Sequence, residues 1–332
     1  MSGVEHRTIT EAEAGLRLDQ WFKSHFPGLA YGRLSKLLRT GQIRLDGGRV
    51  KAGRRLEAGQ DLRIPPLGDL TPGDRPRARA KAPFSQADRA RAEAMLIYRD
   101  GRILALNKEP GLPTQGGSGH RVHVDGLLDA LKFEAPERPR LVHRLDKDTS
   151  GVLLLARDRA TAAELTKAFR TRQCQKIYWA LVVGRPGQAS GRIDLRLDKR
   201  LGPGGEKVIA TDDGKRAVTF YRVIGSAGRR ATWVALRPTT GRTHQLRVHL
   251  AEIGHPIVGD GKYGGREAFL SGSVSRNLHL HARSIHIPGF GKGRSGLQVR
   301  APLPRHMAES WQLLGFEEAD AEDAEAALRE LG

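Results

Sequence analysis

The feature that most constrains the fold is a polar segment held between two apolar runs, LVHRLDKDTSGVLLLARD at residues 141–158. Leu141–His143 and Val152–Ala156 are predicted to be β-strands, because each is a short apolar run next to polar turn residues. The polar residues 144–151 then form the connecting loop. Side chains with chemical roles are often found on such loops, which the flanking strands hold in place. The segment therefore predicts a sheet-based fold with a candidate site at a strand end.

Asp146 is the candidate nucleophile of this loop. Its neighbours Arg144 and Lys147 are cations that favour the ionised carboxylate, which a carboxylate nucleophile requires. The alternative is structural, with Asp146 and Asp148 forming ion pairs with the two cations across a turn. For an isolated loop aspartate the structural interpretation is the more common one.

The charge balance narrows the class of partner. The chain has 56 Lys and Arg residues against 37 Asp and Glu residues, a formal net charge of +19, and a pI of about 10.6. Such an excess of positive charge favours a polyanion as the binding partner. A membrane surface is the rival polyanion, but the sequence shows no long amphipathic helix with a bulky apolar face and no apolar run long enough to cross a bilayer. Nucleic acid is therefore the favoured partner, and no membrane association is expected.

Location and metal content follow from a few residues. The N-terminal stretch has no apolar signal core, so a cytoplasmic location is expected. The single cysteine, Cys174, excludes an internal disulfide and a Cys-rich metal site. Histidines are frequent late in the chain, and His279 and His281 lie on one face of a predicted strand, but their spacings fit no zinc pattern. We expect no metal.

The chain is divided by composition into four segments. Residues 14–65 form a small basic module, and residues 66–92, rich in Pro, Arg and Ala, are predicted to be a flexible basic linker. Residues 93–316 form a long body punctuated by glycines. Residues 317–332 are acidic and Ala-rich and are predicted to be a frayed surface helix or a disordered tail with no chemical role. The expected fold class is α+β, with a mixed, mostly antiparallel sheet, helices packed outside it, and a basic cleft.

The basic module contains a predicted amphipathic helix at residues 31–40. Its apolar face is formed by Leu34, Leu37 and Leu38. Three cations recur three positions apart on the other side: Arg33, Lys36 and Arg39. These cations either bind phosphates or form an ordinary solvated face, and the pattern alone does not decide between the two.

A family resemblance bears on this module. The stretch from RLDQWFKSHF to GQDLRI, residues 17–64, resembles an S4 RNA-binding domain. The most specific part of the match is the basic helix followed by the turn GQIRLDGG. The resemblance implies that the helix binds RNA, and it implies no catalysis.

A second resemblance covers roughly residues 95–305. The string HRLDKDTSG resembles the active-site signature of RluA-type pseudouridine synthases, and QKIYWALVVG and RPTTGRTHQLRVHLAEIGHPIVGDGKYG resemble two further motifs of that family. The S4-like module in front points to its ribosomal large-subunit branch. One departure is Glu109 in NKEPG, which we interpret as a loop insertion without loss of activity. The resemblance implies a cytoplasmic, monomeric isomerase that converts uridines of 23S rRNA to pseudouridine.

The resemblance also assigns roles to single residues. Asp146 matches the catalytic aspartate, and Arg144 matches the arginine that enters the duplex where the target base leaves. Tyr178 matches the tyrosine packed against the target uracil, and Arg247 matches the basic residue that pairs with the catalytic aspartate. Without the resemblance, the favoured interpretation of Tyr178 is a residue packed in the core of a strand. The favoured interpretation of Arg247 is a surface arginine that binds a phosphate.

The reaction that the resemblance implies requires few catalytic groups. The N1 glycosidic bond breaks, the uracil rotates, and C5 bonds to C1′. Since nothing is oxidised, hydrolysed or transferred, no redox carrier, ATP or other cofactor is expected. One carboxylate suffices, either attacking the ribose or acting as a base at C2′. A helical nucleotide must first be flipped out, and an aromatic face can stack on the extruded base.

Two rival functions remain open from the sequence. A non-catalytic S4-type RNA-binding or assembly factor explains the charge and the N-terminal module but leaves the long body without a role. A glycoside hydrolase would use Asp146 and Asp148 as paired carboxylates, one of them protonated. Asp148 lies beside Lys147, a neighbour that favours the ionised form instead.

Overall fold

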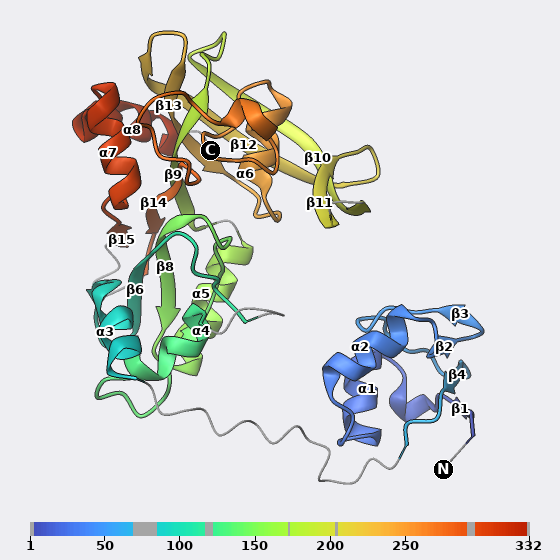
Figure 1. Cartoon of the computed structure of the whole chain (residues 1–332). Helices are drawn as coiled ribbons and strands as arrows, with labels where there is room; N and C mark the ends of the chain where they lie inside the picture. Colours follow the sequence, from blue (N-terminus) through green and yellow to red (C-terminus); the bar gives the residue numbers. More distant parts are fainter. Residues whose placement is uncertain are drawn as a thin grey trace. The chain divides into compact units, whose positions relative to one another are not determined.

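The computed structural model describes residues 3–68, 85–116, 122–171, 173–202, 205–290 and 296–330. By contacts the chain divides into two units, Met1–Pro83 and Phe84–Gly332, which are treated separately below (Figure 1). The predicted linker at residues 66–92 spans the boundary between them, and its residues 69–84 lie outside the described ranges.

The first unit is a four-stranded sheet with two helices. The sheet order is β1–β4–β2–β3, with bounds β1 Glu5–Thr8, β2 Arg44–Leu45, β3 Gly48–Arg49 and β4 Asp61–Ile64. The helices are α1 Leu18–His25 and α2 Tyr31–Arg39, preceded by the short 3-10 helix η1 Glu11–Glu13. The predicted start at residue 14 was wrong. β1 pairs with β4 through Glu5 and Ile64, so the unit includes a strand too short and too polar to be recognised from the sequence.

The hairpin of this unit follows from two residues. Asp46 and Gly47 both have positive φ values, 50° and 74°. A two-residue turn with this geometry matches the twist of the flanking strands and favours the Asp-Gly sequence found here. The turn predicted at these residues is confirmed. The core beneath it contains Trp21, Phe22 and Leu38.

The second unit contains an eleven-stranded mixed sheet. Its order is β11–β10–β12–β13–β9–β14–β8–β6–β5, with β15 beside β14 and β7 beside β8. The strands are β5 Leu96–Arg99, β6 Ile103–Lys108, β7 Arg140–Leu141, β8 Ser150–Ala156, β9 Gln175–Val183, β10 Ser190–Gly202, β11 Gly205–Ala210, β12 Lys215–Ala227, β13 Ala231–Pro238, β14 Leu280–Ile287 and β15 Leu297–Arg300. β14 and β8 run parallel, while the other registered pairs are antiparallel. The predicted α+β class with a mixed, mostly antiparallel sheet is confirmed.

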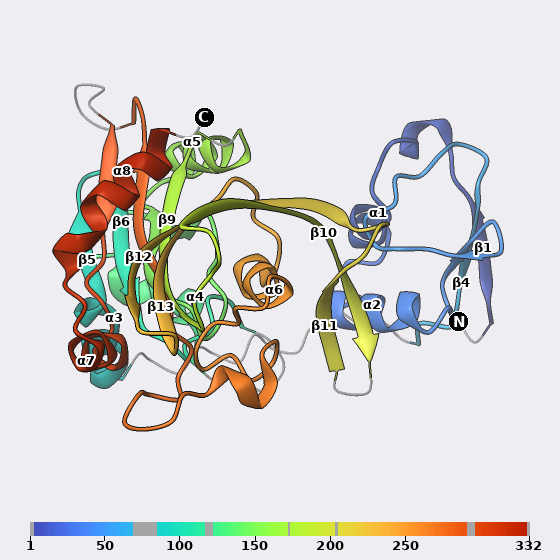
Figure 2. The same ribbon diagram turned by 90° about the horizontal axis from the view of Figure 1, so that it is seen from above.

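Helices cover both faces of this sheet (Figures 1 and 2). Their bounds are α3 Gln86–Ala94, α4 Val124–Leu127, α5 Arg159–Arg170, α6 Gln245–Glu252, α7 Arg305–Leu314 and α8 Glu322–Glu330, with 3-10 helices η3 Leu128–Leu131, η4 Gly265–Ala268 and η6 Glu318–Ala321. At β6 and β8, α3 and α4 pack on one face and α5 on the other. At β9 and β13, α6 packs on one face and α7 and α8 on the other. Figure 2 shows α6 inside the curve of the long strands β10 and β12.

The predicted flexible linker was wrong at its C-terminal end. Residues 86–94 form α3, whose N-terminus is capped by the Ser85 hydroxyl accepting from the Asp88 N–H at 3.0 Å. Ala92 is buried against the sheet, and Arg91 forms an ion pair with Glu109. One buried alanine gives no detectable apolar periodicity, which is why the sequence did not predict this helix.

The C-terminal tail forms a helix, as one of the two predicted alternatives had it, but this helix is packed with a buried face and is not frayed. Residues 318–330 form η6 and α8, whose small apolar face of Ala321, Ala324 and Leu328 is buried. Glu325 is buried as well and accepts a 2.8 Å hydrogen bond from the indole nitrogen of Trp179 on β9. An acidic, Ala-rich sequence resembles a solvated segment, but tertiary contacts determine its structure here.

Candidate active site

The loop between β7 and β8 is held in place by two side chains, one from the last residue of β6 and one from the segment that follows it. The Thr114 hydroxyl accepts from the Leu145 N–H at 3.2 Å and donates to the Leu145 carbonyl at 2.7 Å. Lys108, fully buried at the end of β6, donates to the carbonyl of Lys147 at 3.0 Å and to those of Glu109 and Leu112. Asp146 lies between these two fixed points, so its backbone is restrained on both sides.

The last residue of the HRLDKDTSG string, Gly151, lies where the backbone requires a glycine. Its φ is +110°, and a Cβ at this position would lie 2.2 Å from the carbonyl oxygen of Ala282. Gly151 is paired with Ala282 where β8 and β14 run parallel. A side chain at this position would push the two strands apart. Only glycine therefore fits where the loop enters the sheet.

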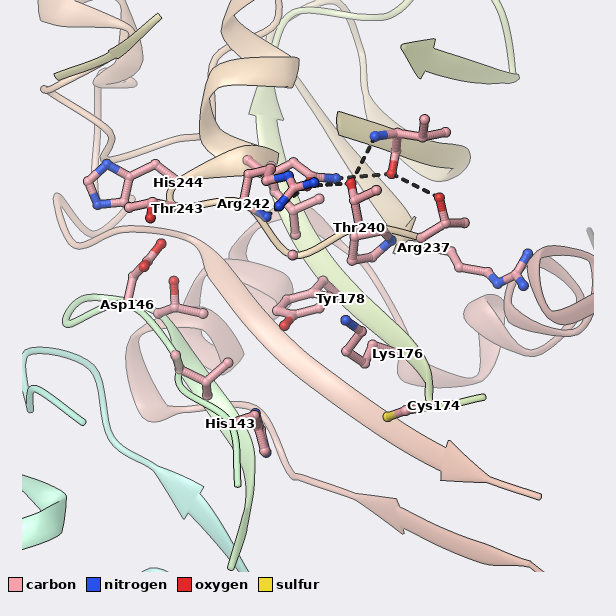
Figure 3. Close-up of a pocket in the computed structure, with 18 of the residues that line it drawn as sticks. His143, Asp146, Cys174, Lys176, Tyr178, Arg237, Thr240, Arg242, Thr243 and His244 are labelled. Atoms are coloured by element: carbon pink, nitrogen blue, oxygen red, sulfur yellow. Dashed lines mark hydrogen bonds between the residues drawn. The ribbon is translucent and has the colours of Figure 1, made fainter. Parts of the chain in front are cut away.

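Asp146 and Tyr178 line one pocket of about 870 Å³. The pocket wall is built from the Arg144–Thr149 loop, the start of β9 and the segment from Arg237 to Arg247 (Figure 3). Of the described residues, one acidic residue lines it, Asp146. Seven arginines of the described ranges also line it: Arg144, Arg170, Arg192, Arg216, Arg237, Arg242 and Arg247. The pocket is suited to an anionic ligand with one carboxylate directed at it.

Tyr178 lies at the middle of this pocket. It is paired with Leu236 on β13 and Ala282 on β14, and its ring packs between two apolar clusters of the sheet. Burial, together with the negative charge of Asp146, raises the pKa of Tyr178, so the phenol stays neutral. Figure 3 shows the ring between Asp146 on one side and Lys176 on the other.

Arg247 has a different direct partner from the predicted one. Its Nε and Nη2 atoms donate to Asp260 at 2.8 and 2.7 Å, and both residues are buried. Burial lowers the pKa of Arg247, but the hydrogen bonds and charge of Asp260, with a smaller contribution from Asp146, raise it overall. The expected ion pair with Asp146 is therefore replaced by a bidentate pair with Asp260, and Asp146 interacts with Arg247 only at longer range.

His244 occupies a strained position next to Asp146 in the pocket. Its φ is 52°, in the left-handed region that L-residues rarely adopt, and its Nδ1 lies 2.7 Å from the Tyr263 hydroxyl. Figure 3 shows its ring facing the carboxylate of Asp146. Burial lowers the pKa of His244, and Asp146 opposes that shift.

Two further loop residues distinguish the rival interpretations. Arg144 is exposed and lines the pocket, and Asp148 is exposed and does not line it. Among the residues that the structure describes, neither Asp146 nor Arg144 forms a hydrogen bond or ion pair through its side chain. The structural alternative, in which Asp146 pairs with Arg144 or Lys147, is therefore not what the loop forms.

The candidate RNA-binding cations of the first unit are all on the outer face of α2. Arg33, Lys36 and Arg39 are exposed, whereas Leu34 and Leu38 are buried. Arg33 uses its Nη2 to bind the Leu67 carbonyl at 2.7 Å, so it also has a structural role. Lys36 and Arg39 form no hydrogen bond or ion pair through their side chains within the described ranges.

Four residues of the site were not identified from the sequence: Lys108, Thr114, Asp260 and Tyr263. Lys108 and Thr114 act through backbone carbonyls, and such contacts leave no pattern in a single sequence. Asp260 and Tyr263 lie within the third motif, in GDGKYG, so their position in a matched string was the available signal.

The late histidines serve the packing of the second unit. His279 contacts Ser310 and the Asn277 carbonyl, and His281 contacts Ser150 and the Ala301 carbonyl. Over the described ranges, we find no group of three or more His, Cys, Asp or Glu side chains placed to bind a metal. Each helix in those ranges is too short or too polar to span a membrane.

Known proteins resemble this chain over most of its length. Residues 102–252 match the family described as RNA pseudouridylate synthase. The ribosomal large subunit pseudouridine synthase C of Escherichia coli K12 is 35% identical, covering 92% of this chain and 95% of the relative. The mitochondrial RNA pseudouridine synthase 4 of Arabidopsis thaliana is 34% identical, covering 89% and 78%.

Solved structures agree with these relatives. The human RNA pseudouridylate synthase domain containing 4 has a TM-score of 0.57 and 30% identity, covering 70% of this chain and 98% of that one. The human RNA pseudouridylate synthase domain containing 1 has a TM-score of 0.50 and 27% identity, covering 66% of this chain and 94% of that one. The chain therefore belongs to the RNA pseudouridylate synthases, a family of isomerases.

Proposed function

We propose that this chain isomerises uridines of the large-subunit (23S) ribosomal RNA and that Asp146 carries out the chemistry. The observation that carries the residue assignment is the position of Asp146. Among the described residues it is the single acidic side chain lining a pocket that seven arginines also line, and its backbone is restrained by Thr114 and Lys108. The RNA substrate rests on the name of the Escherichia coli relative and on the positive charge of the chain.

The proposed reaction uses Asp146 at the ribose of a flipped uridine. In one route the carboxylate attacks C1′, and the C1′–N1 bond breaks with its electron pair leaving on the uracil. The uracil rotates, and C5 attacks C1′ as the carboxylate leaves with the electron pair of its bond to C1′. C5 then loses its proton to water, and N1 takes up a proton. In the other route the carboxylate removes the C2′ proton as the C1′–N1 bond breaks, which leaves a C1′=C2′ double bond. C5 then bonds to C1′, and the carboxylate returns the proton to C2′, while C5 and N1 exchange protons with water as before. Both routes end with the same carboxylate unchanged, so both are compatible with one catalytic residue.

Three neighbours of Asp146 support this reaction. Tyr178, a neutral phenol in the middle of the pocket, stacks on the extruded uracil, an interaction of about 1–3 kcal/mol. Exposed Arg144 enters the space that the base leaves in the helix. Arg247 holds a positive charge near Asp146 while Asp260 fixes its orientation.

The first unit is proposed to bind RNA as an S4-like module. Lys36 and Arg39 lie exposed on α2, with no carboxylate partner in the described part of the chain. Such cations release counterions from RNA when they bind phosphates. We further propose that the enzyme acts as a monomer in the cytoplasm.

The glycoside hydrolase alternative is not favoured by the geometry. It requires a second, protonated carboxyl group in the pocket. Asp148 is exposed and is not among the residues that line the pocket, and its negative charge only partly opposes the lowering of the Lys108 pKa by burial. An isomerase needs no such second acid.

The test uses rRNA labelled with tritium at C5 of uridine. The wild-type protein should release tritium to water without free uracil, because C5 loses its proton while the base stays attached. Asp146→Asn should release none while its RNA affinity stays within a few-fold. Asp148→Asn, two residues away, is the matched control and should retain the wild-type rate. Tritium release by Asp146→Asn would contradict the assignment, and mapping pseudouridine in rRNA from cells without the protein would test the substrate.

A further inference from the structure

Lys176 lies in the pocket beyond Tyr178, on the side away from Asp146 (Figure 3). It is two residues before Tyr178 on β9, so the two side chains share one face of the strand. The register of the sheet gives the same order. On β14, Ala282 pairs with both Tyr178 and Gly151, the residue at which the loop of the nucleophile enters the sheet. Lys176 pairs further along β14, away from that loop.

The ammonium of Lys176 has no counter-ion in the described part of the chain, where it makes no hydrogen bond or ion pair. Burial lowers its pKa, the expected result when an ammonium is desolvated without a carboxylate beside it. Its neighbours are neutral: burial raises the pKa of the Cys174 thiol to about 12, and burial with the charge of Lys176 lowers the pKa of His143 to about 3. An isolated, desolvated charge is costly unless a ligand completes it.

Other buried cations in the second unit are satisfied by the protein itself. Arg247 has both oxygens of Asp260, Lys108 has three carbonyl oxygens, and Arg157 has a backbone carbonyl and a carboxylate. Lys176 differs from all three because it lines the pocket and has no protein acceptor within the described ranges. The missing acceptor is therefore expected to be part of the ligand.

The part of the ligand that faces Lys176 follows from the positions already proposed for the ribose and the base. With the ribose at Asp146 and the uracil stacked on Tyr178, the N1 atom of the ring is directed toward Asp146. The ring atom opposite N1 is C4, so its carbonyl oxygen O4 is directed toward Lys176. An ammonium has three donors and no acceptor, and it therefore binds a carbonyl oxygen and disfavours an amino group.

We propose that Lys176 is a catalytic residue that donates a hydrogen bond to the carbonyl oxygen of the target uracil opposite the ribose. The proposal rests on the proposed function, since it takes a flipped uridine as the ligand. In the intact nucleotide this oxygen is O4. Cytidine carries an amino group at the same position, so the contact also distinguishes uridine from cytidine.

The same contact stabilises the uracil when it leaves the ribose. In both proposed routes the C1′–N1 bond breaks with its electron pair on the uracil, and the ring shares this negative charge with its two carbonyl oxygens. A desolvated ammonium without a counter-ion binds such an oxygen more strongly as the charge develops. The interaction is therefore stronger in the transition state than in the bound substrate, which lowers the barrier to bond cleavage.

The contact is also compatible with the rotation of the uracil. When the ring turns over about the line through N3 and C6, C5 takes the place of N1 and C2 takes the place of C4. The O2 oxygen then lies where O4 was. One fixed donor at Lys176 can therefore hold the base before cleavage and again when C5 bonds to C1′.

The test removes the donor and the acceptor of this contact in turn. Full-length wild-type protein, Lys176→Met and Lys176→Arg are each mixed with a hairpin RNA that has one mapped target position. That position carries uridine, cytidine, or the riboside of 2-pyrimidinone, which lacks O4. Kd is measured for each RNA, and single-turnover tritium release is measured for the uridine RNA. Lys167→Met, which removes an exposed cation on α5 outside the pocket, is the matched control.

The expected result is that removing the donor and removing the acceptor have the same, non-additive effect. Lys176→Met should weaken binding of the uridine RNA about tenfold and slow its single turnover about 100-fold. The 2-pyrimidinone should weaken binding to the wild-type protein by a similar factor to Lys176→Met, and should weaken binding to Lys176→Met no further. Lys176→Met should also lose the preference for uridine over cytidine. Lys176→Arg should keep most of this preference, and Lys167→Met all of it.

Two results would overturn the contact. The first is a set of losses that multiply when Lys176→Met is combined with 2-pyrimidinone, since Lys176 would then act elsewhere. The second is full affinity of the wild-type protein for the 2-pyrimidinone RNA, a measurement that decides the matter if Lys176→Met does not fold. Tritium release by the wild-type protein reports the proposed function separately, because release together with multiplying losses would retain the isomerase and reject the role of Lys176.

Discussion

The two units of the chain hold their cations in opposite ways. In the first unit, Lys36 and Arg39 lie exposed on one face of α2 with no partner in the described ranges. In the second unit, Lys108 and Arg247 are buried and each is fixed by several acceptors. Lys36 and Arg39 are therefore free to move, whereas Lys108 and Arg247 are held in place.

We infer from this difference that the exposed cations mainly affect the affinity for RNA and that the buried cations mainly affect the chemical step. Exposed cations bind phosphates wherever these lie, and their effect is screened by salt. Buried cations position the groups around them, because each interaction has a defined geometry in a medium of low dielectric constant. Removing an exposed cation should therefore change binding gradually, whereas removing a buried one should alter both folding and the chemical step.

The largest effect of this comparison is expected for Lys108→Met. The substitution leaves the carbonyls of Glu109, Leu112 and Lys147 without their buried donor. We expect a loss of about 2–4 kcal/mol in the free energy of unfolding, and a fall in single-turnover rate of at least about 100-fold because the Asp146 loop loses a fixed point. Denaturant unfolding and quenched-flow assays measure both. Lys23→Met, on the exposed face of α1, is the control and should change neither.

The same variant has a distinctive pH dependence. Burial lowers the pKa of Lys108 to about 8, with Asp148, Glu109 and Asp146 opposing the shift, against 10.5 for the unperturbed group. Between pH 8 and 10.5 the unfolded chain then binds more protons at this residue than the folded one, so stability rises with pH across that window. Relative to Lys108→Met, the wild-type protein should gain on the order of 3 kcal/mol from the lower to the upper pH. Parallel stability curves for the two proteins would show that Lys108 is not desolvated as described.

A smaller effect is expected for Asp260→Asn. The amide keeps one acceptor for Arg247 but removes the charge that the guanidinium faces in the interior. Leaving a buried arginine without its anion should cost about 3 kcal/mol of stability and lower the rate about 10- to 100-fold, since Arg247 is freed to bind Asp146 directly. The exposed pair Arg200–Asp213 provides the control, and Asp213→Asn should have little effect on either quantity. Wild-type activity of Asp260→Asn would show that Arg247 does not need its observed orientation.

Much of the fold was predictable from local patterns. The strands on either side of Asp146, the helix α2 and the Asp46-Gly47 turn each have a periodicity or turn residue of their own. α3 and α8 do not, because their buried faces consist mainly of alanine and their other residues are polar. Such helices form only when a sheet is present to pack against, and a single sequence does not contain that information.

The site was predictable in its residues but less so in its contacts. The motif strings identified Asp146, Tyr178 and Arg247, which all line one pocket. The predicted partner of Arg247 was wrong because its position depends on Asp260, thirteen residues further along the chain and brought close by the turn after α6. Lys108 holds the loop through a backbone carbonyl, a contact that any residue at position 147 would provide.

Arg144 is intermediate between the exposed and the buried cations, because it is exposed and yet lines the pocket. A guanidinium stacks on bases and binds two acceptors at once, which the Lys ammonium does not. If Arg144 fills the space of the extruded uridine, it offsets part of the few kcal/mol that flipping costs. Arg144→Lys should then lose much activity on structured RNA and less on RNA whose target uridine is already bulged. Single-turnover rates on both RNAs decide, and equal losses would leave Arg144 as a plain phosphate contact.

The smallest effect is expected for the double variant Lys36→Gln, Arg39→Gln, and it tests the other half of the comparison. These side chains are exposed and form no hydrogen bond or ion pair in the described ranges, so stability should not change. If α2 binds RNA, Kd should rise less than about tenfold at moderate salt, and the slope of log K against log salt should become less steep by about 0.7–0.9 for each lost contact. The rate at saturating RNA should stay at the wild-type value, because Asp146 and its fixed neighbours are unchanged. Isothermal titration at several salt concentrations measures the slope, and Lys23→Gln on α1 is the control for a cation off this face. An unchanged slope would mean that α2 does not touch the substrate, and a reduced saturating rate would mean that the exposed cations also position the target uridine.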